Sequence, residues 1–424
     1  MDAIILPSKL GGTLQVPPSK SMAHRLLICA ALARGTSQVQ NLSYSVDITA
    51  TATAMAQLGA QLNTSAGTAT VTGTGGHFAP PTKAVNCHES GSTLRLLIPV
   101  FSLLGKPVKF TGAARLFQRP HAVYANIFKN QNLPFTQTET SLEIQGPLQS
   151  GHYSLAGNVS SQFISGLLFA LPLLQGNSTL TIAPPFESRS YVLLTQQAQS
   201  LFGVQSNWLN KNTLHIPGGQ QYNATHCTVE GDWSQAAVPA VLGAVLGGVS
   251  VAGLSQTSAQ GDKAILDILQ RCGAAAQWQN GLLTLTPPPG GLCTPSDIDM
   301  ADCPDLGPIV STLGLFCRGT TRLVNAGRLR IKESDRIAAM QTELNKLGGA
   351  LTSTQSTLTI PGPAKLTATQ PAAAHTDHRI VMALTAAALM AGMPLTIAGA
   401  EAITKSWPSF FKDLQTIGAK VELT

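Results

Sequence analysis

Nine residues, 328–336, carry six charged side chains in a chain of which Asp, Glu, Lys and Arg make up only 11%. A window of this length should hold about one charge, so the concentration needs an explanation. One interpretation is a solvated helix start, with Ser334 as the N-cap and Asp335 near the positive end of the helix dipole.

A second interpretation makes this run an anion site that carries its own acid/base group. Lys332 and Arg336 would bind phosphate or carboxylate, and Glu333 would transfer a proton. Further cations lie near predicted helix starts elsewhere in the chain: Lys20, Arg25, Arg95, Arg119, Arg189, Arg379 and Lys405. Asp305 and Glu333 are then the candidate carboxylates for the two ends of a proton-transfer sequence. Structural salt bridges among the same groups are the alternative.

The overall composition favours a protein that binds small anions. A net charge of +6 and a pI near 9.0 could indicate nucleic-acid binding, but aromatic residues are only 5% of the 424 residues and no Lys/Arg-rich block occurs. The seven cysteines contain no CxxC pair, which indicates reduced thiols. The nine histidines show no metal-ligand spacing, so we expect neither a metal nor a cofactor.

The apolar segments do not predict a membrane protein. Residues 1–7 lack a basic region followed by an apolar core, so no secretory signal is expected. The apolar stretch 380–390 is too short and too rich in Ala to span a bilayer. We therefore expect a soluble, cytoplasmic protein.

Glycines that follow apolar, helix-like runs recur at intervals of 70, 71, 72, 71 and 73 residues, and a short strand-like run follows each. The glycines are Gly35, Gly105, Gly176, Gly248, Gly319 and Gly392, and the predicted strands are 36–39, 107–110, 178–182, 249–251, 320–324 and 394–397. This period predicts an α/β chain of six repeats of about 70 residues, which divide naturally into two domains of three.

Each repeat also shows a second helix-like segment that closes at a glycine, where a helix C-cap is expected. These glycines are Gly59, Gly203, Gly273, Gly348 and Gly418, whereas the second repeat reads Asn130-Gln131-Asn132 instead. A further strand follows, most plainly at 68–71, 283–285 and 357–360. The repeat therefore contains two helices and several strands.

Polar residues precede the first helix of every repeat, 14 to 16 residues before its glycine break. They lie at 18–21, 89–92, 160–162, 232–234, 302–305 and 376–379. Any one of them alone is most simply explained as a helix cap. Six helix N-termini together would present free N–H groups and positive dipole ends to a polyanionic ligand held between the domains.

Taken together, these residues resemble the EPSP synthase (3-phosphoshikimate 1-carboxyvinyltransferase) family. The matching motifs follow one another in family order over nearly the whole chain, and the Lys-Glu-Ser-Asp-Arg and Asp-His-Arg motifs are highly specific together. They lie at 17–21 with Arg25, 91–95, 119–120, 160–162, Asp305, 330–336, 377–379 and Lys405.

The resemblance implies two domains of three βαβαββ units each, of the inside-out α/β barrel type. The first domain would be discontinuous, 1–18 with 232–424, and 19–231 would be inserted into it, with the active site in the cleft between them. A monomer is expected. The implied reaction transfers the enolpyruvyl group of phosphoenolpyruvate to the 5-hydroxyl of shikimate 3-phosphate and releases phosphate, through a tetrahedral intermediate.

The resemblance also implies residue roles. Shikimate 3-phosphate would be bound by Ser21, Arg25, Ser160, Ser161, Gln162, Ser188, Arg189, Asp305 and Lys332. Phosphoenolpyruvate would be bound by Lys20, Gly91, Arg119, Gln162, Arg336, Arg379 and Lys405. Asp305 would act as the base beside the attacking hydroxyl, and Glu333, Lys20 and Lys405 would handle protons.

Two alternatives stay open at this point. UDP-N-acetylglucosamine enolpyruvyl transferase shares the fold and the chemistry, but it would be expected to carry a Cys in the loop 112–120 and Lys-Asn where this chain has Lys20-Ser21; the loop has no Cys. A non-catalytic polyanion binder would explain the pI but not the paired carboxylates. The chain also departs from part of the family at 89–90, where Glu-Ser replaces Asn-Ala, and at Arg328, where Asn is found.

Overall fold

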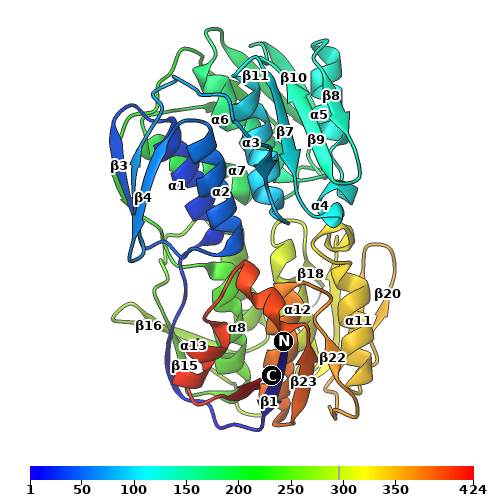
Figure 1. The fold of residues 1–424 in the computed structure, drawn as a ribbon. Helices are drawn as coiled ribbons and strands as arrows, with labels where there is room; N and C mark the ends of the chain where they lie inside the picture. Colours follow the sequence, from blue (N-terminus) through cyan, green and yellow to red (C-terminus); the bar gives the residue numbers. More distant parts are fainter. Residues whose placement is uncertain (295–296) are drawn as a thin grey trace. The chain divides into compact units, whose positions relative to one another are not determined.

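The computed structural model describes residues 1–294 and 297–424, and their contacts divide the chain into two compact units. Unit 1 comprises Met1–Pro17 and Glu230–Thr424, and unit 2 comprises Pro18–Val229. The chain therefore leaves unit 1 after two strands, builds unit 2 and then returns (Figure 1).

Unit 2 alternates strands with helices whose apolar faces supply its core. Its helices are α1 (Lys20–Leu32), α2 (Val46–Gln57), α3 (Gly91–Ser102), α4 (Ala114–Gln118), α5 (Ala122–Asn130), α6 (Ser161–Ala170), the 3₁₀ turn η1 (Leu171–Leu173) and α7 (Arg189–Leu201). Its strands are β3 (Thr36–Gln40), β4 (Gln61–Ser65), β5 (Thr68–Thr72), β6 (Val85–Asn86), β7 (Pro107–Thr111), β8 (Phe135–Gln137), β9 (Ser141–Gln145), β10 (His152–Ala156), β11 (Ser178–Ala183), β12 (Asn207–Asn210), β13 (Thr213–Ile216) and β14 (His226–Thr228).

Unit 1 repeats this alternation. Its helices are α8 (Trp233–Leu246), α9 (Ala264–Arg271), α10 (Gly307–Gly314), α11 (Arg336–Lys346), α12 (His378–Ala391) and α13 (Phe410–Thr416), with 3₁₀ turns η2 (Gly261–Lys263), η3 (Pro304–Leu306), η4 (Gly327–Ile331) and η5 (Ala400–Lys405). Its strands are β1 (Asp2–Leu6), β2 (Gly12–Gln15), β15 (Val249–Ala252), β16 (Ala275–Gln279), β17 (Leu282–Thr286), β18 (Ile298–Asp299), β19 (Gly319–Val324), β20 (Thr352–Ser353), β21 (Leu358–Gly362), β22 (Ala372–Ala373), β23 (Leu395–Ala398) and β24 (Lys420–Leu423).

Within the described ranges, the sheets have four strands each and share one pattern. An edge strand runs parallel to the strand that follows a glycine break, and two antiparallel strands complete the sheet. The orders are β14-β3-β5-β4, β6-β7-β9-β8 and β10-β11-β13-β12 in unit 2, and β2-β15-β17-β16, β18-β19-β21-β20 and β22-β23-β1-β24 in unit 1. The fold is thus mixed α/β in two units, and the predicted strands after the glycine breaks are confirmed.

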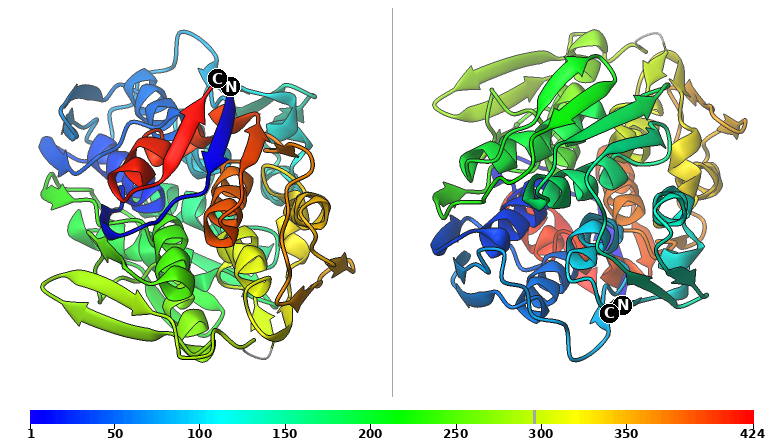
Figure 2. Two further views of the ribbon diagram at one scale, coloured as in Figure 1. Left: turned by 90° about the horizontal axis from the view of Figure 1, so that it is seen from below. Right: turned by 90° about the horizontal axis from the view of Figure 1, so that it is seen from above.

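Three sheets are completed by strands from distant parts of the chain, one of them by the parallel pairing of β2 with β15. β1 lies between β23 and β24 and is antiparallel to both, so the N- and C-terminal strands are side by side (Figure 2, left). The Asp2 amide donates to the Thr424 carbonyl at 2.8 Å. In unit 2 the last strand, β14, pairs in parallel with the first, β3.

The predicted helix ends are confirmed by left-handed backbone. Gly59, Gly203, Gly273, Gly348 and Gly418 have φ values between 81° and 110°. Asn132 takes the same place in the second repeat with φ 55°. Asparagine tolerates this conformation better than most residues, which is why the repeat survives there without a glycine.

Helices that are apolar on all sides form the centre of each unit. In α12, thirteen of fourteen residues are buried, His378 to Met390, and α12 contacts both α8 and α10. In unit 2, α3 packs against α6. A helix without a polar face must be surrounded by protein on all sides. This surrounding protein holds the helix in place, and with it the polar residues at its start. Across the described ranges, no helix is both long and apolar enough to cross a bilayer.

Candidate active site

The polar residues that precede the first helix of each repeat cap that helix in five cases. Each side chain accepts a hydrogen bond from a backbone N–H two or three residues further on. The capping residues are Ser19 in α1, Ser90 in α3, Ser160 in α6, Asp232 in α8 and Asp377 in α12. In the remaining repeat, Asp305 lies inside the 3₁₀ turn η3 that leads into α10.

The charged run 328–336 ends at a helix start, but Ser334 is not its cap. Asp335 accepts from the Ala338 amide at 3.0 Å and caps α11, so the prediction of Ser334 as N-cap is wrong. The Ser334 hydroxyl instead donates to Asp377 Oδ2 at 3.0 Å. The helix N–H is already bound by Asp335, and the buried Asp377 carboxylate is a strong acceptor for the Ser334 hydroxyl.

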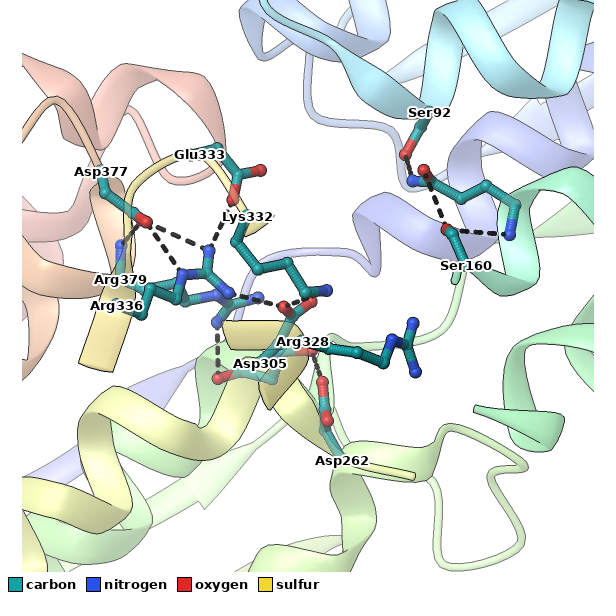
Figure 3. A network of polar contacts seen from close by, with 12 residues as sticks. Ser92, Ser160, Asp262, Asp305, Arg328, Lys332, Glu333, Arg336, Asp377 and Arg379 are labelled. Atoms are coloured by element: carbon teal, nitrogen blue, oxygen red, sulfur yellow. Dashed lines mark hydrogen bonds and ion pairs between the residues drawn. The ribbon is translucent and has the colours of Figure 1, made fainter. Parts of the chain in front are cut away.

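Arg336, the first residue of α11, is the centre of a network of carboxylates (Figure 3). Its side chain is 1% exposed and binds three of them: Asp305 Oδ1 at 2.7 Å, Glu333 Oε2 at 2.8 Å and Asp377 Oδ2 at 2.9 Å. Lys332 adds a second cation, 3.2 Å from Asp305 Oδ1. The charged run is therefore more than a solvated helix start, because its cations hold buried and half-buried carboxylates.

The network sets the protonation of its members. Burial alone would raise the pKa of Asp305, but the charges of Lys332, Arg336 and Arg379 together hold it well below its usual value. Burial lowers the pKa of the Lys332 ammonium, and its carboxylate neighbours oppose that shift only in part. Asp305 is thus ionised at neutral pH and able to accept a hydrogen bond.

Asp262, at the start of unit 1's second helix segment, is a buried acid near this network that the sequence did not single out. It accepts a hydrogen bond from the Ser234 hydroxyl. Burial, followed by the charge of Asp305, raises the pKa of Asp262 to about 6. The backbone carbonyl of Ser234 also accepts a hydrogen bond from Arg379 Nη1 at 2.9 Å. Ser234 therefore contacts both Asp262 and Arg379, which is one of the predicted ligand-binding cations.

Arg379 and Lys405 lie beside the segment that connects β22 to α12. The Arg379 amide donates to Asp377 Oδ1 at 2.9 Å, and the Lys405 ammonium donates to the Thr376 carbonyl at 2.5 Å. Nε of Arg379 is buried and has no hydrogen-bond partner among the described residues. Because buried donors are normally hydrogen-bonded, the Arg379 Nε–H marks a position where an acceptor is missing.

In unit 2, Gly91 and Arg119 are in direct contact. A Cβ at Gly91 would lie 2.7 Å from Arg119 Nη1, so the missing side chain leaves the room that the guanidinium occupies. Nε of Arg119 is also buried without a partner in the described part of the chain. The backbone of Gly91 therefore lies directly against the Arg119 guanidinium.

Gln162 is fixed by two residues of α3. Its amide nitrogen donates to Ser92 Oγ at 2.9 Å, and its oxygen accepts from Arg95 Nη1 at 3.0 Å. Ser92 and Ser160 are labelled in Figure 3. Arg95 also donates to the Pro120 carbonyl at 3.1 Å, which ties the 119–120 loop to the same point.

Arg25 is buried against α6 and α7. Its Nε donates to Thr195 Oγ1 at 2.8 Å, and its Nη2 donates to the Tyr191 carbonyl at 3.0 Å. It also returns to its own helix, donating to the Ser21 carbonyl at 2.6 Å. Burial lowers the pKa of Arg25 to about 10, so it stays charged at neutral pH.

The other predicted residues of unit 2 occupy distinct surroundings. Lys20 forms an ion pair with Asp47, Nζ to Oδ2 at 2.9 Å. Ser188 precedes α7 in a left-handed conformation, φ 54°. Arg189 stacks 4.3 Å from the Trp208 ring and donates to the Lys211 carbonyl at 2.9 Å, contacts that connect it to the β12–β13 hairpin.

Sequence reasoning missed the partners of the predicted residues. Asp47, Ser92, Asp262 and Asp377 each hold a predicted site residue or lie near the network, and only Ser92 and Asp377 stand inside quoted motifs. The regular helix starts could have pointed to Ser92, which follows the capping Ser90. The described residues contain no group of three or more His, Cys, Asp or Glu placed to hold a metal ion.

The chain is similar to known proteins over nearly its whole length. The family model described as EPSP synthase (3-phosphoshikimate 1-carboxyvinyltransferase) matches residues 5–414. The 3-phosphoshikimate 1-carboxyvinyltransferase of Clostridium kluyveri is 40% identical over 421 residues, 99% of this chain and 97% of the relative. That of Clostridium acetobutylicum is 40% identical over 422 residues, 98% of this chain and 97% of the relative.

Solved structures agree. A 2.37 Å structure of EPSP synthase from Acinetobacter baumannii has a TM-score of 0.79 and 26% identity, and the match covers 100% of both chains. The enolpyruvyl transferase NikO from Streptomyces tendae has a TM-score of 0.80 over 100% of this chain and 98% of its own, but at 17% identity this likeness concerns the fold alone.

Proposed function

The chain belongs to the EPSP synthase family, and we propose which of its residues carry the family's reaction. It transfers the enolpyruvyl group of phosphoenolpyruvate to the 5-hydroxyl of shikimate 3-phosphate and releases phosphate, a step of the shikimate pathway. The residue roles below are supported by the geometry of each unit.

The observation that carries the assignment is a pair of buried guanidinium groups with an unsatisfied donor. Arg119 in unit 2 and Arg379 in unit 1 both have a buried Nε without a partner among the described residues. Unpaired buried donors are costly, so such groups mark positions where a ligand supplies the acceptor. We assign phosphoenolpyruvate, with its phosphate and carboxylate, to Arg119, Arg379 and their neighbours Lys20, Gly91, Gln162, Arg336 and Lys405.

Shikimate 3-phosphate is assigned to the other cationic and hydroxyl groups. The start of α6 offers Ser160, Ser161 and Gln162 at the positive end of the helix dipole, which suits a phosphate. Arg25 and Lys332 supply positive charge, Ser188 and Arg189 add contacts at the start of α7, and Asp305 accepts from a hydroxyl of the shikimate ring.

The reaction needs proton transfers in both of its steps, addition and elimination. In the addition step, the methylene carbon of phosphoenolpyruvate gains a proton, and the 5-hydroxyl oxygen bonds to the adjacent carbon while losing its own proton. In the elimination step, the bond to phosphate breaks and the new methyl group returns a proton. Ionised Asp305 is proposed as the base for the hydroxyl, and Glu333, Lys20 and Lys405 as the groups that move the proton at carbon.

We also propose the finer organisation of the protein. Domains 1–18 with 232–424 and 19–231 would each contain three βαβαββ units of the inside-out barrel type, with the active site in the cleft between them. The shared strand order of the sheets supports this proposal. We also propose that the protein is a cytoplasmic monomer.

Phosphate release from phosphoenolpyruvate tests the function. Purified protein would receive shikimate 3-phosphate or UDP-N-acetylglucosamine in separate reactions without added metal. We expect release with shikimate 3-phosphate alone. Release only with the sugar nucleotide would move the activity to the sister enzyme, and release with neither would reject enolpyruvyl transfer to both acceptors.

A further inference from the structure

The segment 374–377 connects β22 to α12 and touches two of the residues assigned to phosphoenolpyruvate. Its Thr376 carbonyl accepts from Lys405 Nζ at 2.5 Å. Its last residue, Asp377, caps the helix that carries Arg379 and binds the Arg379 amide at 2.9 Å. The position of this segment therefore decides where both cations lie.

The segment has an unfavourable backbone. His375 and Thr376 have φ values of 50° and 53°, in the left-handed region that residues other than glycine rarely adopt. For a β-branched residue such as Thr376 this is a strained conformation. Strain of this kind persists only where the surroundings hold the backbone in place.

Glu343 supplies that hold from the last turns of α11. Its carboxylate is 1% exposed. One oxygen lies 2.7 Å from His375 Nε2, and the other accepts from the Ala373 amide at 3.0 Å. Lys346, one turn further along the same helix, donates to both oxygens at 3.0 and 2.9 Å. Thus one buried carboxylate holds Ala373, directly before the segment, and His375, the first of its left-handed residues.

Helix α11 binds the segment at two points. Arg336 at its start binds Asp377, Nε to Oδ2 at 2.9 Å, and Glu343, seven residues later, binds Ala373 and His375. Seven residues are about two helical turns, so both side chains leave the same face of α11, separated by about 10 Å along its axis. The two contacts fix both ends of the strained stretch.

We propose that Glu343 is a positioning residue for phosphoenolpyruvate binding. By holding Ala373 and His375, it keeps the backbone carbonyl of Thr376 directed at Lys405. Glu343 lies among none of the residues assigned to the substrates, and it acts through the segment rather than on a ligand. The inference rests on the proposed function, since it requires Lys405 to bind phosphoenolpyruvate.

The test compares Glu343→Gln with Lys346→Ala. Glu343→Gln removes the negative charge that holds His375. Lys346→Ala removes a different partner of the same carboxylate, one from α11 itself, and leaves the contacts of Glu343 with Ala373 and His375 in place. We expect Glu343→Gln to raise KM for phosphoenolpyruvate about tenfold, the size of one lost charge-assisted hydrogen bond. KM for shikimate 3-phosphate should stay unchanged in both variants.

His375→Asn is the second variant, in case Glu343→Gln does not fold. Asparagine accepts the left-handed backbone but is too short to replace the ring contact, so a smaller rise in KM for phosphoenolpyruvate alone is expected. The proposal would be overturned if KM rose equally for both substrates, or if Lys346→Ala raised the KM for phosphoenolpyruvate as much, because Glu343 would then stabilise the fold in general. It would also be overturned if neither Glu343→Gln nor His375→Asn raised that KM, because Glu343 would then have no effect on binding.

Lys405→Met separates this inference from the function on which it rests. If Lys405→Met raises KM for phosphoenolpyruvate and Glu343→Gln does not, the positioning role is rejected and the site stands. If Lys405→Met leaves that KM unchanged, the assignment of Lys405 itself is rejected, whatever Glu343→Gln does.

Discussion

Arg336 and Asp377 form a buried ion pair that ties the start of α11 to the start of α12, with Nε to Oδ2 at 2.9 Å and Nη2 to Oδ1 at 3.3 Å. Asp377 is fully buried and Arg336 is 1% exposed. Burial would raise the pKa of Asp377, but the Arg336 charge holds it below its usual value. The pair therefore depends on both partners being present.

Asp377→Asn should consequently lower the free energy of unfolding by about 2 kcal/mol, because it weakens the fully buried one of three carboxylate contacts to Arg336 while Asp305 and Glu333 remain. Urea unfolding monitored by tryptophan fluorescence measures this. The matched control is Arg322→Ala, whose partner Asp297 lies at 3.1 Å with both side chains about half exposed; its loss should be below about 1 kcal/mol. Similar losses in both variants would show that Asp377 is not held as a charge.

Glu333→Gln should reduce turnover far more than substrate affinity. Glutamine keeps an oxygen for Arg336 Nη2, now 2.8 Å from Glu333 Oε2, but it does not transfer a proton at neutral pH. We expect kcat to fall by about a hundredfold or more, with little change in either KM. The exposed Glu143→Gln on β9 serves as control, and equal effects on kcat and KM would make Glu333 a structural group.

Asp262→Asn should stabilise the protein at high pH. The pKa of Asp262 is raised to about 6, so folding is favoured by its protonated form and this contribution is lost as pH rises from about 4 through 6. Asparagine resembles the protonated acid and still accepts from Ser234. The variant should be more stable than the parent by up to about 3 kcal/mol at pH 8, and the difference should vanish at pH 4. A difference independent of pH would contradict the shifted pKa.

Gly91→Ala should weaken phosphoenolpyruvate binding selectively. The new Cβ would lie 2.7 Å from Arg119 Nη1, so the guanidinium must move. We expect a several-fold higher KM for phosphoenolpyruvate, and no change for shikimate 3-phosphate. Gly11→Ala is the control, since its Cβ would meet nothing nearer than 3.8 Å. An unchanged KM would mean that Arg119 does not bind that substrate where it stands.

Substrates should draw the two units together, because the cations assigned to the substrates come from both and neither unit holds the full set. Small-angle scattering with shikimate 3-phosphate and an unreactive phosphoenolpyruvate mimic should show a smaller radius of gyration than the protein alone. An unchanged radius would speak against this closure.

The repeating elements could be predicted because their signals are local. A glycine after an apolar helix is explained by the backbone conformation of that one residue. The strand that follows is recognised from the residue types of about five neighbouring positions. Asn132 obeys the same rule with a different residue, φ 55°. The helix starts at 18–21 and 376–379 likewise depend on capping by neighbouring residues.

The partners of the site residues could not be predicted, because they come from distant parts of the chain. Ser334 reaches Asp377, 43 residues away, and Lys20 reaches Asp47, 27 residues away. Capping rules alone do not choose between Ser334 and Asp335 for α11, since both are good N-caps. The choice is made by the buried Asp377 carboxylate, whose position only the packed helices define.

The placement of β1 also has a consequence for how the protein is made. β1 pairs with β23 and β24, and β2 pairs with β15, whereas β14 completes the first sheet of unit 2 by residue 228. On the ribosome, unit 2 has all its strands once β14 has emerged, while β1 must wait for the last thirty residues of the chain. The inserted unit can therefore fold during synthesis, and the unit that begins the chain is the last to be completed.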